Sequence, residues 1–230
     1  MKIKSRELDY ETVLSLPKEK HLPPKRPNII FRTLLRTLSI PDLKATNFSL
    51  EKTGMERLVK NEPALFLMNH SSFIDLKIAA SVLYPRPFNI ICTSDGFVGK
   101  AALMRNFGCI PTKKFITDTT LVRDMLYAAK ELHDSILLYP AASYTFDGTA
   151  TPLPESMGKL LKLLKLPLVM IKTDGAFLRD PLYNMLQLRK VNVRATMRYV
   201  LSPDEIKEKS VAELNAVLKD LFTFDNFRSQ

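Results

Sequence analysis

The chain of 230 residues contains no long apolar run of the kind that marks a secretory signal or a membrane span. Charged side chains interrupt its N-terminal segment, and no apolar stretch is long enough to cross a bilayer without a charge. These absences argue against both a leader peptide and a spanning helix. We therefore expect a cytoplasmic protein whose contact with a membrane is peripheral, on its inner face.

Cysteine and glycine are both scarce in this sequence. Cys92 and Cys109 are the only cysteines, and they are too few for a disulfide framework and are not spaced as metal ligands. A reduced, intracellular chain is the simplest interpretation. The 7 glycines stand against 15 prolines, so proline marks many of the boundaries between the expected elements.

Acidic residues are fewer than basic residues, 24 against 34, which gives the chain a formal net charge of +10 and a pI of about 9.6. Such a balance indicates an anionic partner, whether nucleic acid, anionic lipid, an acidic carrier protein or a phosphorylated substrate. Nucleic acid is not favoured, because the chain has no recognised binding motif and no basic run interleaved with aromatic residues. The hydrophobic share of 46% is enough for a real core.

The first part of the chain, residues 1–45, is expected to form a basic arm followed by an amphipathic helix at 29–38. Apolar residues there follow the spacing of one helix face: Phe31, Leu34, Leu35 and Leu38. Arg32 and Arg36 lie together on another side. Two interpretations are open, a helix that lies on anionic lipid and a helix that packs on the rest of the protein.

Residues 46–230 are expected to form a single domain in which strands alternate with helices. Strands are predicted at 48–51, 64–69, 88–94, 108–111, 135–140, 166–173 and 192–201, and helices at 71–84, 97–107, 119–133, 158–165 and 203–221. Ser71 or Ser72 is expected near the N-cap of the first of these helices. The alternation predicts an α/β fold with a central mostly parallel or mixed sheet, flanked by helices and preceded by a short N-terminal helical arm.

The stretch from Asn69 to Asp75 is expected to carry the chemistry. It lies between a predicted strand and a predicted helix, and functional groups often collect at the carboxyl ends of strands in α/β sheets. A separation of five residues lets the Asp75 carboxylate meet one imidazole nitrogen of His70 and fix the tautomer. The other nitrogen can then take a proton from a hydroxyl, which the substrate itself can supply. His-x4-Asp is a short pattern, and a histidine that caps a helix beside a surface aspartate is the alternative.

The letters NHSSFID at 69–75 resemble the NHxSxxD motif of the PlsC-type glycerol-phosphate and lysophosphatidic acid acyltransferases. Gly108, Ile110 and Lys114 resemble the second block of this family, G-x-I-x-x-x-R, with lysine in place of arginine. Residues 139–144 resemble its third block, F-P-E-G-T-R, and the strand at 166–169 resembles its fourth. The resemblance extends over about residues 45–200 and implies that His70 is the general base and Asp75 its orienting partner.

The third block departs from the family pattern, since Ala141 stands where the family has glutamate and Tyr144 where it has arginine. A methyl and a phenol cannot replace groups that fix a polar site by charge-assisted hydrogen bonds. Three hypotheses follow: a subfamily with a different acceptor, a lipid- or carrier-binding pseudoenzyme, or a substitution that disabled a glutamate site. Lys113 and Lys114 either hold a phosphate as point charges or form a solvated basic turn.

The resemblance implies transfer of a fatty acyl chain from acyl-CoA or acyl-acyl carrier protein to a hydroxyl of a lysophospholipid-like acceptor, such as 1-acylglycerol-3-phosphate. This reaction belongs to phospholipid biosynthesis and requires neither a metal nor a cofactor. The expected partners are the donor, the acceptor, an anionic membrane surface and an acyl carrier protein. Beside the catalytic pair, substrate-binding residues are expected at Asn69, Ser72, Gly108, Lys113, Lys114, Ala141, Ser143 and Tyr144.

Overall fold

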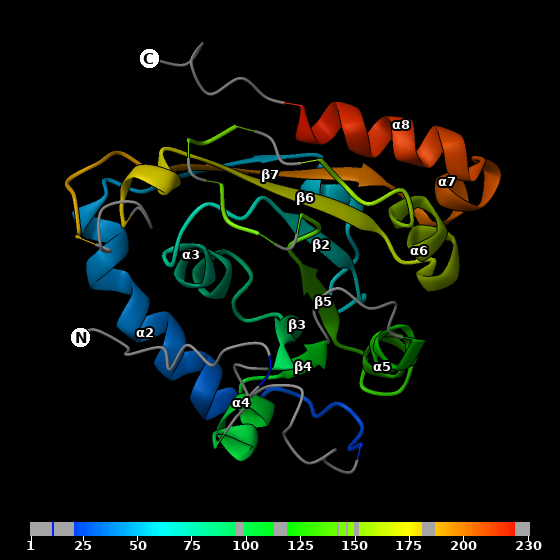
Figure 1. Ribbon diagram of the computed structural model, residues 1–230, viewed down its shortest axis with the longest axis horizontal. Helices are drawn as coiled ribbons and strands as arrows, with labels where there is room; N and C mark the ends of the chain where they lie inside the picture. Colours follow the sequence, from blue (N-terminus) through cyan, green and yellow to red (C-terminus); the bar gives the residue numbers. More distant parts are fainter. Residues whose placement is uncertain are drawn as a thin grey trace.

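A seven-stranded sheet forms the centre of the protein (Figure 1). The computed structural model describes Glu11 and residues 21–94, 99–112, 119–141, 143–145, 147–149, 152–180 and 187–223. The strands are β1 (Ser49–Thr53), β2 (Leu65–Met68), β3 (Phe88–Thr93), β4 (Cys109–Thr112), β5 (Ser135–Leu138), β6 (Leu168–Asp174) and β7 (Arg194–Leu201). Each of the predicted strand segments overlaps one of them.

The strands lie in the order β1-β7-β6-β2-β5-β3-β4. Strands β6 and β7 pair antiparallel, while the other neighbouring strands pair parallel. The prediction of an α/β fold with a mostly parallel or mixed sheet is therefore confirmed. Strand β2 lies at the centre, so the turn after it opens at the middle of the sheet's carboxyl edge, where α/β folds commonly place their sites.

The side chains on the two faces of β2 pack into two separate hydrophobic clusters, which explains why its sequence is apolar throughout. Phe66 and Met68 belong to one cluster, and Leu65 and Leu67 to the other. All four side chains are almost completely buried. Helices cover both faces, and they are α2 (Ile29–Ala45), α3 (Asp75–Val82), α4 (Ala101–Asn106), α5 (Thr119–Lys130), α6 (Met157–Leu164), α7 (Pro203–Glu208) and α8 (Val211–Phe222).

Helices α2 and α3 lie on one side of the sheet, and α5, α6 and α8 on the other (Figure 1). The single helix predicted at 203–221 is two helices, because a second capping box interrupts it. In each box the serine side chain accepts from the glutamate N–H and the glutamate reaches back to the serine N–H. Ser202 and Glu205 form the first box, and Ser210 and Glu213 form the second.

The N-terminal segment reaches the body of the protein through two side-chain contacts with buried carboxylates. His21 contacts Asp124, and Arg26 contacts Asp134. The earlier part of the predicted arm lies outside the described residues apart from Glu11. Helix α2 extends well beyond the predicted 29–38. Among the helices of the described ranges, none combines the length and apolar character needed to cross a bilayer.

Candidate active site

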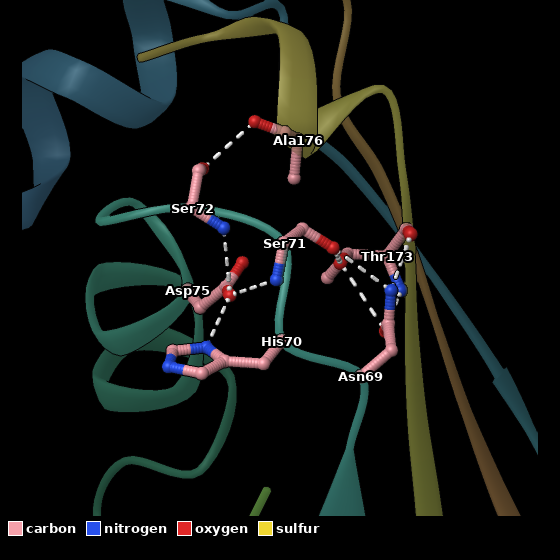
Figure 2. Close-up of polar contacts among 7 residues, drawn as sticks. All are labelled: Asn69, His70, Ser71, Ser72, Asp75, Thr173 and Ala176. Atoms are coloured by element: carbon pink, nitrogen blue, oxygen red, sulfur yellow. Dashed lines mark hydrogen bonds and ion pairs between the residues drawn. The ribbon is translucent and has the colours of Figure 1, made fainter. Parts of the chain in front are cut away.

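The turn between β2 and α3 brings His70 and Asp75 into direct contact (Figure 2). His70 Nδ1 lies 3.0 Å from Asp75 Oδ2. An ionised carboxylate can only accept, so this contact places the proton on Nδ1 and leaves Nε2 as the free acceptor. The His70 side chain is 17% exposed and that of Asp75 1%. The imidazole therefore has access to solvent while the carboxylate behind it is sealed.

Two backbone amides donate to the same oxygen of Asp75 that His70 contacts. The N–H groups of Ser71 and Ser72 donate to Oδ2 at 2.6 and 3.0 Å. Within the described part of the chain Oδ1 has no hydrogen-bond partner. Burial raises the pKa of the Asp75 carboxyl, and the hydrogen bonds from His70 and the two amides oppose this increase. The carboxylate thus fixes both the ring and the loop that carries it.

Neither Ser71 nor Ser72 caps α3 with its side chain, contrary to the sequence prediction. The helix begins only at Asp75, with Ile74 as its N-cap residue, and the amides of both serines donate to the Asp75 carboxylate. Ser72 Oγ donates to the carbonyl of Ala176 at 2.8 Å. Ala176 begins the short 3-10 helix η3 (Ala176–Leu178), so this contact holds η3 against the catalytic turn.

Asn69 joins the end of β2 to β6. Its amide nitrogen donates to the carbonyl of Thr173 at 3.0 Å and to Ser71 Oγ at 2.9 Å. Its amide oxygen accepts from the backbone N–H of Thr173 at 2.7 Å. All of these groups are buried. The motif asparagine therefore fixes the position of the strand end from which His70 projects (Figure 2).

Two tyrosine rings stack on the His70 imidazole. The ring centroid of Tyr139 lies 4.0 Å away with planes 19° apart, and that of Tyr144 lies 3.8 Å away with planes 30° apart. Two rings cannot occupy one face of the imidazole at these separations, so the tyrosines cover opposite faces. The peptide N–H of Thr145 donates to the His70 carbonyl at 2.9 Å, which joins the third block to the catalytic turn.

Both phenols remain protonated at neutral pH. Burial, followed by the nearby Asp75 carboxylate, raises the pKa of Tyr139 well above its usual range. The same two causes raise the pKa of Tyr144. Tyr139 Oη is buried and has no hydrogen-bond partner among the described residues. Each phenol can therefore act as a hydrogen-bond donor toward a bound molecule.

Of the other predicted binding residues, the structure brings some to the site and places others elsewhere. Ala141 follows β5 in the third block, where its carbonyl accepts from Ser143 Oγ at 3.3 Å. Gly108 lies at the amino end of β4, away from the dyad. Its positive φ of 80° and the closeness of Pro27 explain why glycine stands there. Lys113 and Lys114 lie outside the described residues.

Three residues of this neighbourhood are not among the binding residues predicted from sequence. Tyr139 and Thr173 lie at or just after the end of a buried strand, and Tyr139 is also the first residue of the third block; these are the sequence signals that could have indicated them. Asp180 is 8% exposed and its Oδ1 has no partner among the described residues; burial raises the pKa of its carboxyl, and the Ser72 side chain opposes this increase. No group of three His, Cys, Asp or Glu side chains within the described ranges is arranged to hold a metal.

Comparison with known proteins identifies a family and a similar fold. The family model described as acyltransferase matches residues 49–171. The chain is similar to the crystal structure of the 1-acyl-sn-glycerophosphate (LPA) acyltransferase PlsC from Thermotoga maritima, with a TM-score of 0.67 and 11% sequence identity. That match covers 83% of this chain and 76% of the other, and at this identity it shows the fold alone. Comparison with curated proteins gave no match.

Proposed function

The chain belongs to the acyltransferase family, and from this premise we propose that it moves a fatty acyl chain from a thioester donor to a hydroxyl of a lysophospholipid-like acceptor. The observation that carries the proposal is the contact of 3.0 Å between His70 Nδ1 and Asp75 Oδ2, with Nε2 left free. The donor is acyl-CoA or acyl-acyl carrier protein. The reference acceptor is 1-acylglycerol-3-phosphate, on which the structural relative acts according to its description.

In this reaction His70 Nε2 takes the proton of the acceptor hydroxyl while the oxygen attacks the thioester carbonyl. Asp75 stabilises the imidazolium that results. The tetrahedral intermediate then collapses, the C–S bond breaks, and the leaving thiolate receives the proton from His70. No protein nucleophile is needed, because the acceptor supplies the oxygen. The stacked rings of Tyr139 and Tyr144 favour one orientation of the imidazole.

We propose that the protein works on the surface of an anionic membrane. Helix α2 exposes Ile30, Leu34 and Leu38 along one side, and their exposed fractions are 71%, 47% and 64%. Arg36 and Lys44 on the same helix are also exposed. An apolar stripe accompanied by basic side chains favours peripheral binding to anionic lipid. In this arrangement the acceptor stays in the lipid layer while its hydroxyl reaches His70.

The basic residues of the second block have a role in the same proposal. Lys113 and Lys114 would hold the acceptor head group or the phosphates of the donor as point charges. Exposed apolar side chains beside the catalytic turn, Phe73 and Leu76, would contact the acyl chain. Asn69 and Ser72 act through the position of the turn, since their side chains bind other protein groups.

A second function is favoured by one specific feature, the third block. Ala141 provides no carboxylate there, and Tyr144 covers one face of the His70 ring. A protein that binds lipid or acyl carrier without turnover is the alternative that these residues support. Stoichiometric binding of a lysolipid without any thiol release, also after restoration of glutamate at 141, would support it.

The test measures thiol release from acyl thioesters in the presence of lysophospholipids. We expect release that depends on the acceptor in the unmodified chain or in Ala141→Glu, and its loss in His70→Ala. Circular dichroism and lysolipid binding check that His70→Ala is folded. If neither form acylates any hydroxyl or amine acceptor, while His70→Ala leaves folding and binding unchanged, the enzymatic function is wrong.

A further inference from the structure

A hollow lies at the end of α3 that is opposite to the catalytic turn, where α2 passes beside α3 (Figure 1). Arg32, Tyr84 and Arg86 line it together with apolar side chains, among them Leu35 and Phe107. Its empty space of about 320 Å³, part of it open to solvent, is at the small end of ligand sites. Helix α3 has 8 residues, so about 12 Å of helix separates the hollow from the catalytic turn. The hollow is therefore distinct from the candidate active site, and its size suits a small polar group rather than a whole lipid.

Arg32 of α2 places a guanidinium in the wall of the hollow. Its Nη1 donates to the carbonyl of Pro85 at 2.6 Å, which holds the side chain against the segment that follows α3. Its Nε is buried and has no hydrogen-bond partner within the described ranges. A guanidinium carries five N–H groups and no acceptor, so it can bind more oxygen atoms than Pro85 supplies. A bound oxyanion provides acceptors that the described part of the chain does not give this side chain.

Arg86 brings a second guanidinium to the hollow from the segment between α3 and β3. Backbone carbonyls hold it, since Nη2 donates to that of Val59 at 3.3 Å and Nη1 to that of Glu62. Carbonyl oxygens orient the group without neutralising its charge. Burial lowers the pKa of Arg32 and Arg86, yet a guanidinium keeps its proton at neutral pH. The fold therefore holds two cations partly out of water, an arrangement that a bound anion stabilises.

Basic groups outnumber acidic groups around the hollow, and no carboxylate lines it in the described part of the chain. The two carboxylates that act on its arginines have partners of their own. Asp134 is bound by Arg26 at 2.9 Å, and the Glu62 carboxylate accepts from the N–H of Val59 at 3.2 Å. The guanidinium carbon of Arg36 lies beside the hollow, 4.5 Å from the centroid of the Tyr84 ring. An excess of two positive charges results from four guanidiniums against two carboxylates: Arg26, Arg32, Arg36 and Arg86 against Asp134 and Glu62.

We propose that this hollow binds a phosphate group between the guanidiniums of Arg32 and Arg86. Arginine pairs with phosphate through charge-assisted hydrogen bonds. A phosphomonoester carries a charge of about −1.5 to −2 at neutral pH, which balances the positive excess. The group belongs either to the head of an anionic lipid or to a free phosphate. The lipid is favoured, because α2 also exposes the apolar stripe of Ile30, Leu34 and Leu38. The lipid source rests on the membrane contact proposed above, whereas phosphate binding itself does not depend on acyl transfer.

Hydrogen–deuterium exchange of the unmodified chain locates the site without a mutation. The probes are dihexanoyl phosphatidic acid below its critical micelle concentration, inorganic phosphate, and dihexanoylglycerol, which lacks the phosphate. Phosphatidic acid should slow exchange at 29–37 and 80–88 and leave α8 unchanged, and dihexanoylglycerol should slow neither segment. Protection by inorganic phosphate as well supports a free phosphate as the source, and protection by the lipid alone supports a lipid head group. If neither phosphate compound protects these segments, the site is wrong.

Two arginine variants test which side chains bind the group. Titration of the protection at 80–88 with phosphatidic acid gives the dissociation constant of this site alone. Arg32→Gln and Arg86→Gln should each increase it by about tenfold or more, the effect of losing one charge-assisted contact. Arg32→Lys retains the charge without the planar fork, so its loss should be smaller. Arg198→Gln on β7 removes an exposed arginine outside the lining and should bind like the unmodified chain. Binding equal to this control in both folded glutamine variants would overturn the assignment.

The outcomes also distinguish this inference from the proposed function. Protection at 80–88 without acyl transfer by any form would leave the phosphate site standing and make the acyltransferase function wrong. Acyl transfer without that protection would overturn the site and leave the function standing. If circular dichroism shows a glutamine variant to be unfolded, the exchange of the unmodified chain and of Arg32→Lys decides.

Discussion

Thr173 donates its backbone N–H to Asn69 Oδ1 at 2.7 Å across a sequence separation of 104 residues. This bond joins the carboxyl ends of β2 and β6 directly beside the catalytic turn. Asn69 also donates to the Thr173 carbonyl. A single buried side chain therefore supplies the hydrogen bonds between the two strands at the point where their backbone pairing ends. The position of His70 therefore depends on a residue that has no part in proton transfer.

Asn69→Ala is expected to lower the free energy of unfolding by about 2–3 kcal/mol, because it leaves the buried N–H and carbonyl of Thr173 unsatisfied. Urea denaturation at neutral pH measures the change. Asn192→Ala removes an exposed asparagine that also bonds a side chain, and it should change stability by less than about 0.5 kcal/mol. Equal stability of Asn69→Ala and the unmodified protein would contradict the bridging role.

Asp75→Asn should decrease kcat by about 10²- to 10⁴-fold, since an amide can present its NH2 to His70 and favour the wrong tautomer. The Michaelis constant for the donor should change little, because Asp75 is sealed from solvent. Steady-state thiol release with a fixed acceptor gives both parameters. Asp204→Asn, an exposed carboxylate in α7, is the matched control. Full activity of Asp75→Asn would exclude it as the orienting group.

Ala141→Glu should increase acyl transfer by about tenfold or more, since it returns a charge-assisted acceptor to the third block. Ala141→Gln has nearly the same shape without the charge and should give a smaller increase. Both are assayed by thiol release and by mass spectrometry of the acylated product. A decrease in both variants would indicate that alanine at 141 belongs to a subfamily with its own acceptor.

Asp42→Asn should destabilise the protein at neutral pH by about 0.5–1 kcal/mol, a discounted value for a partly exposed pair. The hydrogen bond and charge of Lys77, with a smaller effect of Arg179, lower the pKa of Asp42 from its usual value, against the opposing effect of burial. The stabilisation is therefore complete above the unfolded pKa and is lost as the pH falls through the folded pKa. Chemical denaturation at pH 7 and pH 3 should show the difference between variant and parent shrinking in acid.

Leu34→Glu and Leu38→Glu should each weaken binding to anionic vesicles by about tenfold, because each removes an apolar contact and adds a repelled charge. Vesicle co-sedimentation with phosphatidylglycerol measures the binding. Val59→Glu alters an exposed apolar side chain that does not belong to α2, and its binding should fall much less. Equal losses in all of these variants would argue that general charge, and not α2, governs the association.

Local patterns predicted the frame of the fold well. The apolar run at 64–69 became β2, and the alternation of strands and helices indicated the mixed sheet. The resemblance to acyltransferases is confirmed by the family model. The expected contact between His70 and Asp75 is present, because both residues lie in one short turn. Its catalytic role stays a prediction.

Contacts between distant segments could not be read from the sequence. Nothing near Tyr139 indicates that it would stack on His70 opposite Tyr144. The N-cap prediction at Ser71 or Ser72 was wrong because the serine hydroxyls bond to the distant Thr173 and Ala176 instead of accepting from the first amides of α3. Tertiary hydrogen bonds outweighed the local preference.

The stacked tyrosines have a consequence for spectroscopy. His70 is one of three histidines in the chain, and aromatic ring currents act on its carbon-bound protons from both sides. Its resonances are therefore displaced upfield from those of His21 and His133. The displacement decreases if Tyr144 swings away when a substrate enters, because only the ring of Tyr139 then remains, so the magnetic environment of a single proton reports how often the base is uncovered.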